Sequence, residues 1–306
     1  MRKLWFIGMC MLVMNVQAQG PVLFAKELFN NLPMVRDLSL SQSKDELYFT
    51  VESYRKDISF IASSHLEKEG WSSPEIVAFS GKFKDLEPSL SPDGLRLFFV
   101  SNRAVGGGTK KDMDIWYVHR VDTKAPWSAP IRLGNAINTD RDEFYPVLTN
   151  SGNLYFTANY TEDTKGKEDI YCSLWKNGAY QKPFSLGKAI NSEKYEYNAY
   201  VDPAEENLFF TSYGREEDLG NGDLYWSVKK DGVWQPAVHL GAEVNSKYSD
   251  YCPFYDAATG RLYFTSTRST PWKQRSQAIS MKTFLKVLGD QPNGLSRIYY
   301  VALNKN

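Results

Sequence analysis

Five short strings with one shared pattern recur along the chain, and they constrain its fold more than any other feature of the sequence. Each string reads Leu, an aromatic residue, Phe, and then Thr or Val, and successive strings start 50, 57, 54 and 54 residues apart. The strings occupy residues 47–50, 97–100, 154–157, 208–211 and 262–265. Self-similarity at such a period is the signature of a repeat architecture, in which each unit packs on its neighbours.

Each repeat unit carries the signals of four strands. A turn-forming segment precedes each string, and its Gly, Pro, Asn, Asp or Ser residues supply the dihedral angles of a tight hairpin. A further aromatic-rich strand follows, and in four units an element similar to Trp-Ser-x-Pro then leads into a fourth strand. Four strands in a unit of this length are typical of a propeller blade. The sequence therefore predicts an all-β fold, a five-bladed β-propeller of four-stranded antiparallel blades.

The ends of the chain indicate how the ring closes. The fifth unit stops after its third strand, near residue 303, whereas a lone strand-like segment, residues 22–29, precedes the first unit. We expect this N-terminal strand to complete the last blade, because pairing of the chain ends removes exposed sheet edges. Residues 19–306 then form a single propeller domain. A helical insert is expected at about residues 270–294 of the last blade, either packed over the rim or serving as a lid or a partner-docking helix.

The second unit carries a known repeat pattern. Residues 87–94 read Glu-Pro-Ser-Leu-Ser-Pro-Asp-Gly, residues 97–103 read Leu-Phe-Phe-Val-Ser-Asn-Arg, and residues 114–117 read Asp-Ile-Trp-Tyr. This stretch resembles the TolB-type, WD-repeat-like β-propeller repeat, and the resemblance covers nearly the whole mature chain. The third and fourth units depart from the Pro-Asp-Gly turn. The resemblance implies a propeller but no single function, because relatives include binding platforms, envelope assembly factors and domains attached to hydrolases.

The N-terminus has the three parts of a secretory signal peptide. Arg2 and Lys3 precede an apolar run, and Val16 and Ala18 place small residues at the spacing that a signal peptidase recognises. We therefore expect residues 1–18 to be removed by cleavage after Ala18. The product would be periplasmic or secreted.

Composition excludes several functional classes. The mature chain would carry a formal net charge of about −2, which leaves no electrostatic footprint for nucleic acid. No second apolar stretch is long enough to span a membrane. Three scattered histidines argue against a zinc site, and Cys172 and Cys252 fall in units that are not neighbours, which argues against a disulfide. We expect no metal, no cofactor, no nucleic-acid partner and no membrane span in the mature chain.

Candidate binding residues follow from the topology of a blade. The entry to the innermost strand and the loop between the second and third strands lie on the same face. At this entry, three residues before the conserved Pro or its equivalent, four units carry an acid: Asp85, Glu143, Glu196 and Asp250. The remaining members of the predicted binding set lie beside these acids or after the second strand: Tyr197, Tyr251, Arg103, Arg215 and Arg268.

Two interpretations of this set stay open. Repeated residues usually serve repeated structure, so each acid would pair with an arginine or cap backbone amides between blades. Alternatively, carboxylates and aromatic rings converge on an axial pocket that binds a sugar, or that hydrolyses one with two carboxylates at a set separation. The candidates for such catalysis are Glu143 and Glu196.

The function we expect is that of a non-catalytic envelope or periplasmic propeller that binds a protein or glycan partner through its loop-rich face. The sequence shows no set of catalytic residues that is distinct from the residues repeated in every unit. The broad, rigid rim of a propeller is also suited to binding a partner. Two alternatives stay open. One is a carbohydrate-active enzyme, a glycoside hydrolase or lyase, that uses axial carboxylates. The other is a structural subunit of an envelope assembly.

Overall fold

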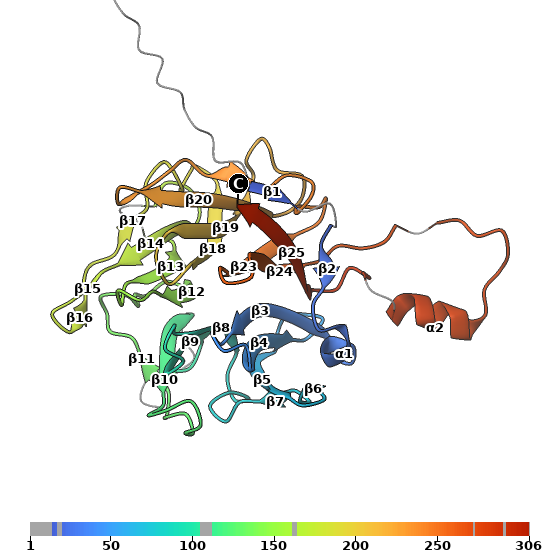
Figure 1. Cartoon of the computed structure of the whole chain (residues 1–306), viewed down its shortest axis with the longest axis horizontal. Coiled ribbons are helices and arrows are strands. Elements are labelled where there is room, and N and C mark those ends of the chain that lie inside the picture. The colour runs from blue at the N-terminus through green and yellow to red at the C-terminus, as the bar shows by residue number, and fades with distance from the viewer. Residues whose placement is uncertain are drawn as a thin grey trace, which may run out of the picture.

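The computed structural model describes residues 14–16, 20–104, 112–160, 164–271, 273–289 and 292–305. Within these residues, five antiparallel sheets surround a central axis, which confirms the predicted five-bladed propeller (Figure 1). The expected signal peptide falls largely outside the described residues. Among the described residues, none of the helices is both long enough and apolar enough to cross a bilayer.

Each blade contributes one strand to each of four positions. The innermost strands are β3 (Met34–Leu40), β8 (Asp85–Leu90), β12 (Glu143–Leu148), β18 (Tyr195–Val201) and β23 (Asp250–Asp256). The second strands, which contain the repeated strings, are β4 (Glu46–Glu52), β9 (Arg96–Ser101), β13 (Leu154–Ala158), β19 (Asn207–Tyr213) and β24 (Arg261–Ser266). The third strands are β5 (Ser59–Glu67), β10 (Asp114–His119), β14 (Asp169–Ser173), β20 (Asp223–Lys230) and β25 (Arg297–Lys305).

The outermost position holds only short strands. These are β7 (Glu75–Ile76), β11 (Ile131–Arg132), β17 (Phe184–Ser185), β22 (Val238–His239) and β2 (Val22–Leu23). The remaining strands extend the third strands or their loops: β6 (Gly70–Trp71), β15 (Trp175–Lys176), β16 (Ala179–Tyr180), β21 (Val233–Trp234) and β1 (Met14–Val16). Neighbouring innermost strands contact one another all the way round, including β23 with β3, so the ring is closed.

The ring closes through the N-terminal strand, as the sequence predicts. Val22 pairs with Tyr300 and Leu23 with Tyr299, so β2 is the fourth strand of the last blade. The strand is shorter than expected, because Lys26–Phe29 forms the one-turn helix α1 instead. Phe29 is buried and its ring lies edge-on to that of Phe49 at 5.0 Å, which fills the gap between the last and first blades.

The repeated string explains the hydrophobic core. Successive side chains of a strand point to opposite faces, so one string serves two gaps between blades. Leu97 and Phe99 pack into the core between blades 1 and 2, whereas Phe98 and Val100 pack into the core between blades 2 and 3. The other gaps contain cores of the same kind. Both faces of the second strand are therefore buried, which is why the string has no polar alternation.

An asparagine after the outermost strand extends the short ladder of three blades. The Asn138 side chain accepts a hydrogen bond from the Ile115 amide at 2.8 Å and donates one to the Ile115 carbonyl at 2.9 Å. Asn191 and Asn245 make the same pair of bonds with Ile170 and Leu224. The Asn side chain thus satisfies a backbone amide of the third strand, and it adds a second donor to a carbonyl that already accepts from the backbone amide of Leu133, Leu186 or Leu240.

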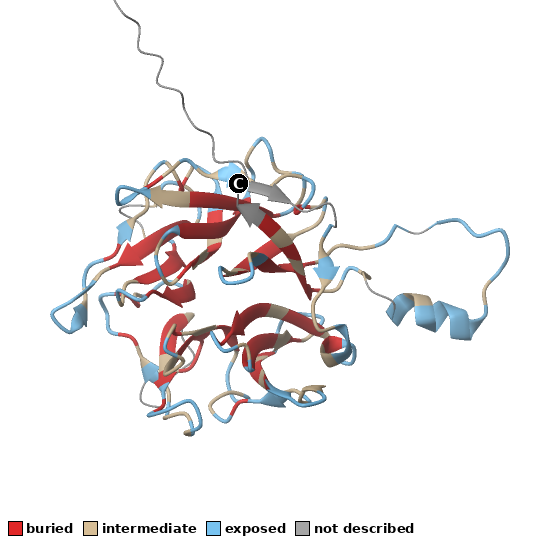
Figure 2. Cartoon of the chain, in the orientation of Figure 1, coloured by how far each residue is buried: buried red, intermediate tan, exposed pale blue. Residues whose placement is uncertain are grey.

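The insert of the last blade holds the helix α2 (Met281–Gly289) on an arm that extends away from the propeller body (Figures 1 and 2). The helix begins after Ser280, whose hydroxyl accepts a hydrogen bond from the Thr283 amide at 3.2 Å. None of its residues is buried. The expected packing of this helix over the rim is therefore not found, and its apolar side chains face solvent. Cys172 and Cys252 are both buried and free, as the sequence predicts.

Candidate functional site

The four predicted acids lie at the start of the innermost strands and are completely buried. Asp85, Glu143, Glu196 and Asp250 are each 0% exposed. None of them lines either of the two cavities on the propeller axis that the described residues form. Their proposed binding role stays a prediction.

Three of the acids form ion pairs with the three predicted arginines. The pairs are Arg103 Nη2 with Asp85 Oδ1 at 2.7 Å, Arg215 Nη2 with Glu196 Oε1 at 2.8 Å, and Arg268 Nη2 with Asp250 Oδ1 at 2.8 Å. Each guanidinium also donates to a backbone carbonyl of the segment before its innermost strand, at Phe79, Ile190 or Val244. The same two interactions at three equivalent places indicate that each arginine fastens its blade to the incoming loop.

Glu143 has no arginine partner among the described residues, and a different group holds its carboxylate. The amide and the hydroxyl of Thr139 both donate to Oε1, at 3.1 and 2.7 Å. Burial raises the pKa of Glu143 to about 8, because these hydrogen bonds offset only part of the cost of removing a charge from water. Of the two catalytic candidates, Glu143 thus caps a loop and Glu196 is bound to Arg215.

A bulge in every innermost strand shapes the axis. The strand register shifts at the same place in all five blades. One residue of each bulge adopts a positive φ of 49 to 61°, and these residues are Asp37, Glu87, Tyr145, Asn198 and Cys252. A β-bulge bends a strand and redirects its side chains, and non-glycine residues rarely adopt this conformation. Because the bulge occurs at the same place in all five blades, it is a regular feature of this propeller and not a local irregularity.

The residues just before the bulges line an axial cavity of about 420 Å³. They are Arg36, Leu86, Phe144, Tyr197 and Tyr251. Tyr197 and Tyr251 were predicted for this place, and the structure brings them together. Loop residues including Lys56, Lys84 and Glu168 complete the wall, so the cavity opens on the loop-rich face where the sequence places it.

The bulge residues form a polar network at the axis. Arg36 Nε donates to Asp37 Oδ1 at 2.8 Å, and Nη2 donates to Glu87 Oε1 at 3.0 Å. Asn198 Nδ2 lies 3.3 Å from the same Glu87 oxygen, and Asn198 Oδ1 accepts a weak hydrogen bond from the Cys252 thiol at 3.4 Å. The network ties four blades together. It separates the cavity from a second one of about 240 Å³, which is lined by residues that follow the bulges.

The carboxyl groups of Glu52, Glu87 and Glu168 line the first cavity, and burial raises the pKa of each. The pKa of Glu87 rises to about 8, although the Arg36 charge opposes the shift. The Glu52 side chain is buried, and its Oε2 has no hydrogen-bond partner among the described residues. Near neutral pH these groups therefore hold their protons more readily than exposed carboxyls do.

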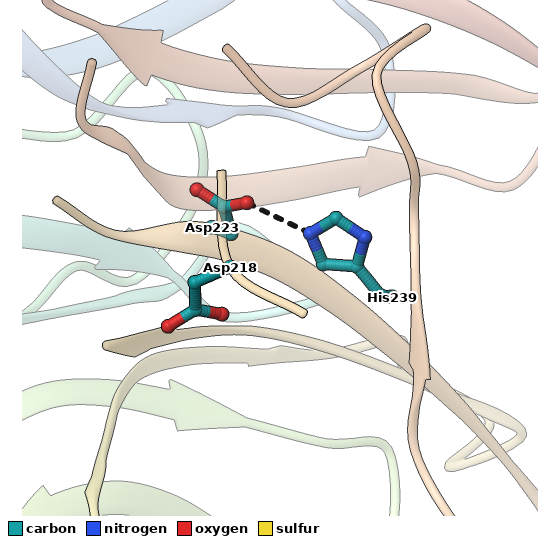
Figure 3. Close-up of side chains that lie close together, drawn as sticks. All are labelled: Asp218, Asp223 and His239. Atoms are coloured by element: carbon teal, nitrogen blue, oxygen red, sulfur yellow. Dashed lines mark hydrogen bonds and ion pairs between the residues drawn. The ribbon is translucent and has the colours of Figure 1, made fainter. Parts of the chain in front are cut away.

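A separate cluster in blade 4 brings Asp218, Asp223 and His239 together (Figure 3). Asp223 accepts hydrogen bonds from two backbone amides and lies 2.8 Å from His239 Nε2, while Asp218 accepts from the Tyr225 hydroxyl at 2.6 Å and from two amides. Equivalent aspartates occur in blades 2 and 3 with other partners: Asp114 with Arg132, and Asp169 with Ser185. The position therefore serves the blade, and its carboxylate oxygens already have partners.

Sequence reasoning missed Arg36, Glu52 and Glu87 as residues of the axial cavity. The signal for Arg36 was present, because blade 1 has this cation where the other blades have Leu86 or an aromatic residue. The signal for Glu87 was weaker, since it directly precedes Pro88 in a unit that matches the general repeat. Glu52 lies two residues after its string, where the other units have Asn102, Asn159, Tyr213 and Thr267, so blade 1 is again the exception.

Comparisons with known proteins support the fold but do not assign the protein to a family or a function. No family model matches the chain, and neither does any curated protein. The fold is similar to that of the α-L-arabinofuranosidase PaAbf62A from Podospora anserina in complex with cellotriose, with a TM-score of 0.54 and 11% identity over 93% of this protein and 95% of that one. It is also similar to the catalytic domain of the GH62 α-L-arabinofuranosidase of Coprinopsis cinerea, with a TM-score of 0.53 and 10% identity over 96% and 97% of the two proteins.

A third similarity, to TolB from Acinetobacter baumannii, has a TM-score of 0.48 and 11% identity over 89% of this protein. The match spans 56% of the length of that TolB. The score is too low for this likeness to carry an argument. The first two likenesses, at such low identity, concern the fold alone.

Proposed function

We propose that this protein is a non-catalytic β-propeller of the cell envelope, of the TolB-like kind, that binds a glycan in the axial cavity of its loop-rich face. The observation that carries the proposal is the composition of that cavity. It combines the rings of Phe144, Tyr197 and Tyr251 with charged and polar side chains from all five blades, and its cations all come from the first two. Its volume of about 420 Å³ falls within the usual range of ligand sites.

Aromatic rings and hydrogen-bonding groups together suit a sugar. A pyranose ring presents an apolar face of C–H groups, which packs against an aromatic side chain, and a rim of hydroxyl groups, which need hydrogen-bond partners. Phe144 and Tyr197 are half-buried, so part of each ring remains accessible. The expected signal peptide supports a location where envelope or extracellular glycans occur.

The proposal is tested by binding of residues 19–306 to an array of glycans, followed by calorimetry with those retained. We expect Tyr197→Ala to weaken binding at least fivefold, since loss of a central aromatic contact costs more than about 1 kcal/mol. The matched control is Tyr195→Ala, which alters the same residue type in the same strand but lies outside the cavity. An array that retains no glycan, or equal affinity in both variants, overturns the proposal.

A second candidate is a glycoside hydrolase or lyase that works in the same cavity. It is favoured by Glu52, Glu87 and Glu168, because a general acid needs a raised pKa and burial raises that of all three. The assay is the appearance of new reducing ends or unsaturated products when the wild-type protein is incubated with a glycan that it binds. If such products form, and are lost in Glu52→Gln or Glu168→Gln, the enzyme replaces the non-catalytic proposal. Binding of a glycan without formation of any product supports the non-catalytic proposal.

A further inference from the structure

The axial cavity has two chemically different halves. Blades 1 and 2 contribute all the cations of the lining, Arg36, Lys56 and Lys84, together with the carboxyl groups of Glu52 and Glu87. Blades 3 to 5 contribute the rings of Phe144, Tyr197 and Tyr251, together with the carboxyl group of Glu168 and the polar side chains of Thr157, Asn198, Ser249 and Thr267. This polarity arises because the five equivalent residues before the bulges are not alike. Four are apolar or aromatic, and Arg36 is the exception. A ligand that fills the cavity therefore meets cations on one side and aromatic rings on the other.

Arg36 is held in place by its neighbours but keeps donors for a ligand. Its Nε and Nη2 atoms are used by Asp37, Glu87 and Cys252, and its guanidinium lies 5.3 Å from the centre of the Tyr251 ring. Its Nη1 takes part in no hydrogen bond among the described residues. A guanidinium fixed in this way loses little conformational freedom when it binds a carboxylate.

The two lysines strengthen the positive half. Lys84 Nζ donates to the Lys56 carbonyl at 2.9 Å, which places this ammonium group at the edge of the cavity. Lys56 is exposed on the loop between β4 and β5. The lining of this half holds three cations, Arg36, Lys56 and Lys84, against the two carboxyl groups of Glu52 and Glu87, and burial raises the pKa of both carboxyl groups. The half of the cavity made by blades 1 and 2 thus presents net positive charge at neutral pH.

Glu52 presents a further polar atom to a ligand in the cavity. Its side chain is 3% exposed and lines the cavity, and Oε2 has no partner in the described part of the chain. A buried polar atom without a partner is uncommon in a folded protein. A hydroxyl group of a bound sugar would satisfy this oxygen.

We infer that the ligand is an acidic sugar, a uronic acid residue of a polysaccharide, whose carboxylate binds Arg36 and Lys84 while its ring packs against Tyr197 and Phe144. The inference rests on the proposed function and narrows it to one class of glycan. A neutral sugar would leave the Arg36 Nη1 and the Lys84 ammonium without an anionic partner, and a small anion alone would leave the aromatic half uncovered. A uronic acid residue satisfies both halves at once.

The test compares charged and neutral forms of the same sugars by calorimetry. Oligomers of galacturonate, glucuronate and mannuronate are measured beside their carboxyl-reduced counterparts. We expect at least one oligomer to bind ten times more tightly than its reduced form, with an affinity that falls as the salt concentration rises. Lys84→Ala should weaken that binding about tenfold, whereas Lys82→Ala, which removes a nearby lysine outside the cavity, should leave it unchanged.

Arg36→Gln, tested where it remains folded, should remove the preference for the charged form. Preference for neutral glycans, or equal effects of the two lysine variants, overturns the inference and leaves the proposed function standing. Tighter binding of a sulfated sugar than of every uronate overturns the assignment of a carboxylate. Absence of binding to any glycan overturns both proposals.

Discussion

The backbone amide of Tyr145 donates a hydrogen bond to Oε2 of Glu87 over 2.7 Å, across the junction between blades 2 and 3. At three other junctions the amide of the bulge residue donates to the threonine that ends the string of the preceding blade: Thr50 accepts from Glu87, Thr157 from Asn198, and Thr265 from Asp37. Blade 2 has Val100 at that position. The Glu87 carboxylate therefore replaces a hydroxyl group that the repeat lacks there.

Glu87→Ala should lower the free energy of unfolding by about 2–3 kcal/mol, because it leaves the buried Tyr145 amide without an acceptor. Adding Val100→Thr should recover about 1 kcal/mol, since a hydroxyl at this position is an acceptor at three other junctions. Urea denaturation followed by circular dichroism measures both changes. Val100→Thr alone is the control, and no recovery in the double variant would contradict the equivalence of the two acceptors.

Two threonines in equivalent positions should respond differently to the same change. Thr157 Oγ1 accepts the Asn198 amide at 3.1 Å, whereas Thr211 Oγ1 is buried and has no partner in the part of the chain that the structure describes. Thr157→Val should therefore cost about 1–2 kcal/mol of stability, and Thr211→Val should be nearly neutral. Thermal and urea unfolding of the pair measure the difference. Equal losses would show that the hydroxyl groups do not act through these bonds.

The buried ion pair between Arg268 and Asp250 should serve stability rather than binding. Arg268→Met should lower the free energy of unfolding by about 3–5 kcal/mol, because the Asp250 carboxylate loses its charge partner in a buried site. Adding Asp250→Asn should restore part of that loss, which a double-mutant cycle quantifies. Glycan affinity of the folded double variant should stay within about twofold of the wild type. A loss of affinity without loss of stability would instead favour a binding role for these residues.

Glu143 should make the protein less stable as the pH rises. The folded chain holds this proton up to about pH 8, whereas the group ordinarily loses it near pH 4.5. Between these values the folded state binds more protons than the unfolded state, so a rise in pH favours unfolding by up to about 1.4 kcal/mol per pH unit. The stability difference between Glu143→Gln and the wild type, measured from about pH 5 to pH 8, should grow with pH in favour of the variant. A constant difference would show that Glu143 is ionised throughout.

The blades, their strand order and the ring closure could be predicted from the sequence, because each depends on a pattern that repeats five times. The pairing of Asp85 with Arg103 was also accessible, as one of two open interpretations. The axial cavity was harder to predict, because no residue type marks the position of a bulge in the sequence. An aspartate, a glutamate, a tyrosine, an asparagine and a cysteine share the bulge position and have no common side-chain property. The bulge shifts which residue faces the axis, so sequence reasoning chose Asp85 where Glu87 lines the cavity.

The helix α2 shows a different limit of prediction. Its apolar stripe was legible, and Met281, Phe284, Leu285 and Leu288 do lie at helical spacing. Such a stripe predicts a buried face, but these four side chains are 41–70% exposed. A sequence pattern shows that a helix has an apolar face, whereas the length of the connecting arms decides whether that face reaches the body.

The pairing of β2 with β25 sets an order of events during synthesis. Because more than 270 residues separate β2 from β25, synthesis at roughly ten residues per second makes the first strand wait about half a minute for its partner. Until then the edge of the third strand of the last blade does not exist, and the ring cannot close. A chain in which β25 is not yet available remains an open arc with an exposed flank, and a chaperone that protects this flank would act before the ring closes.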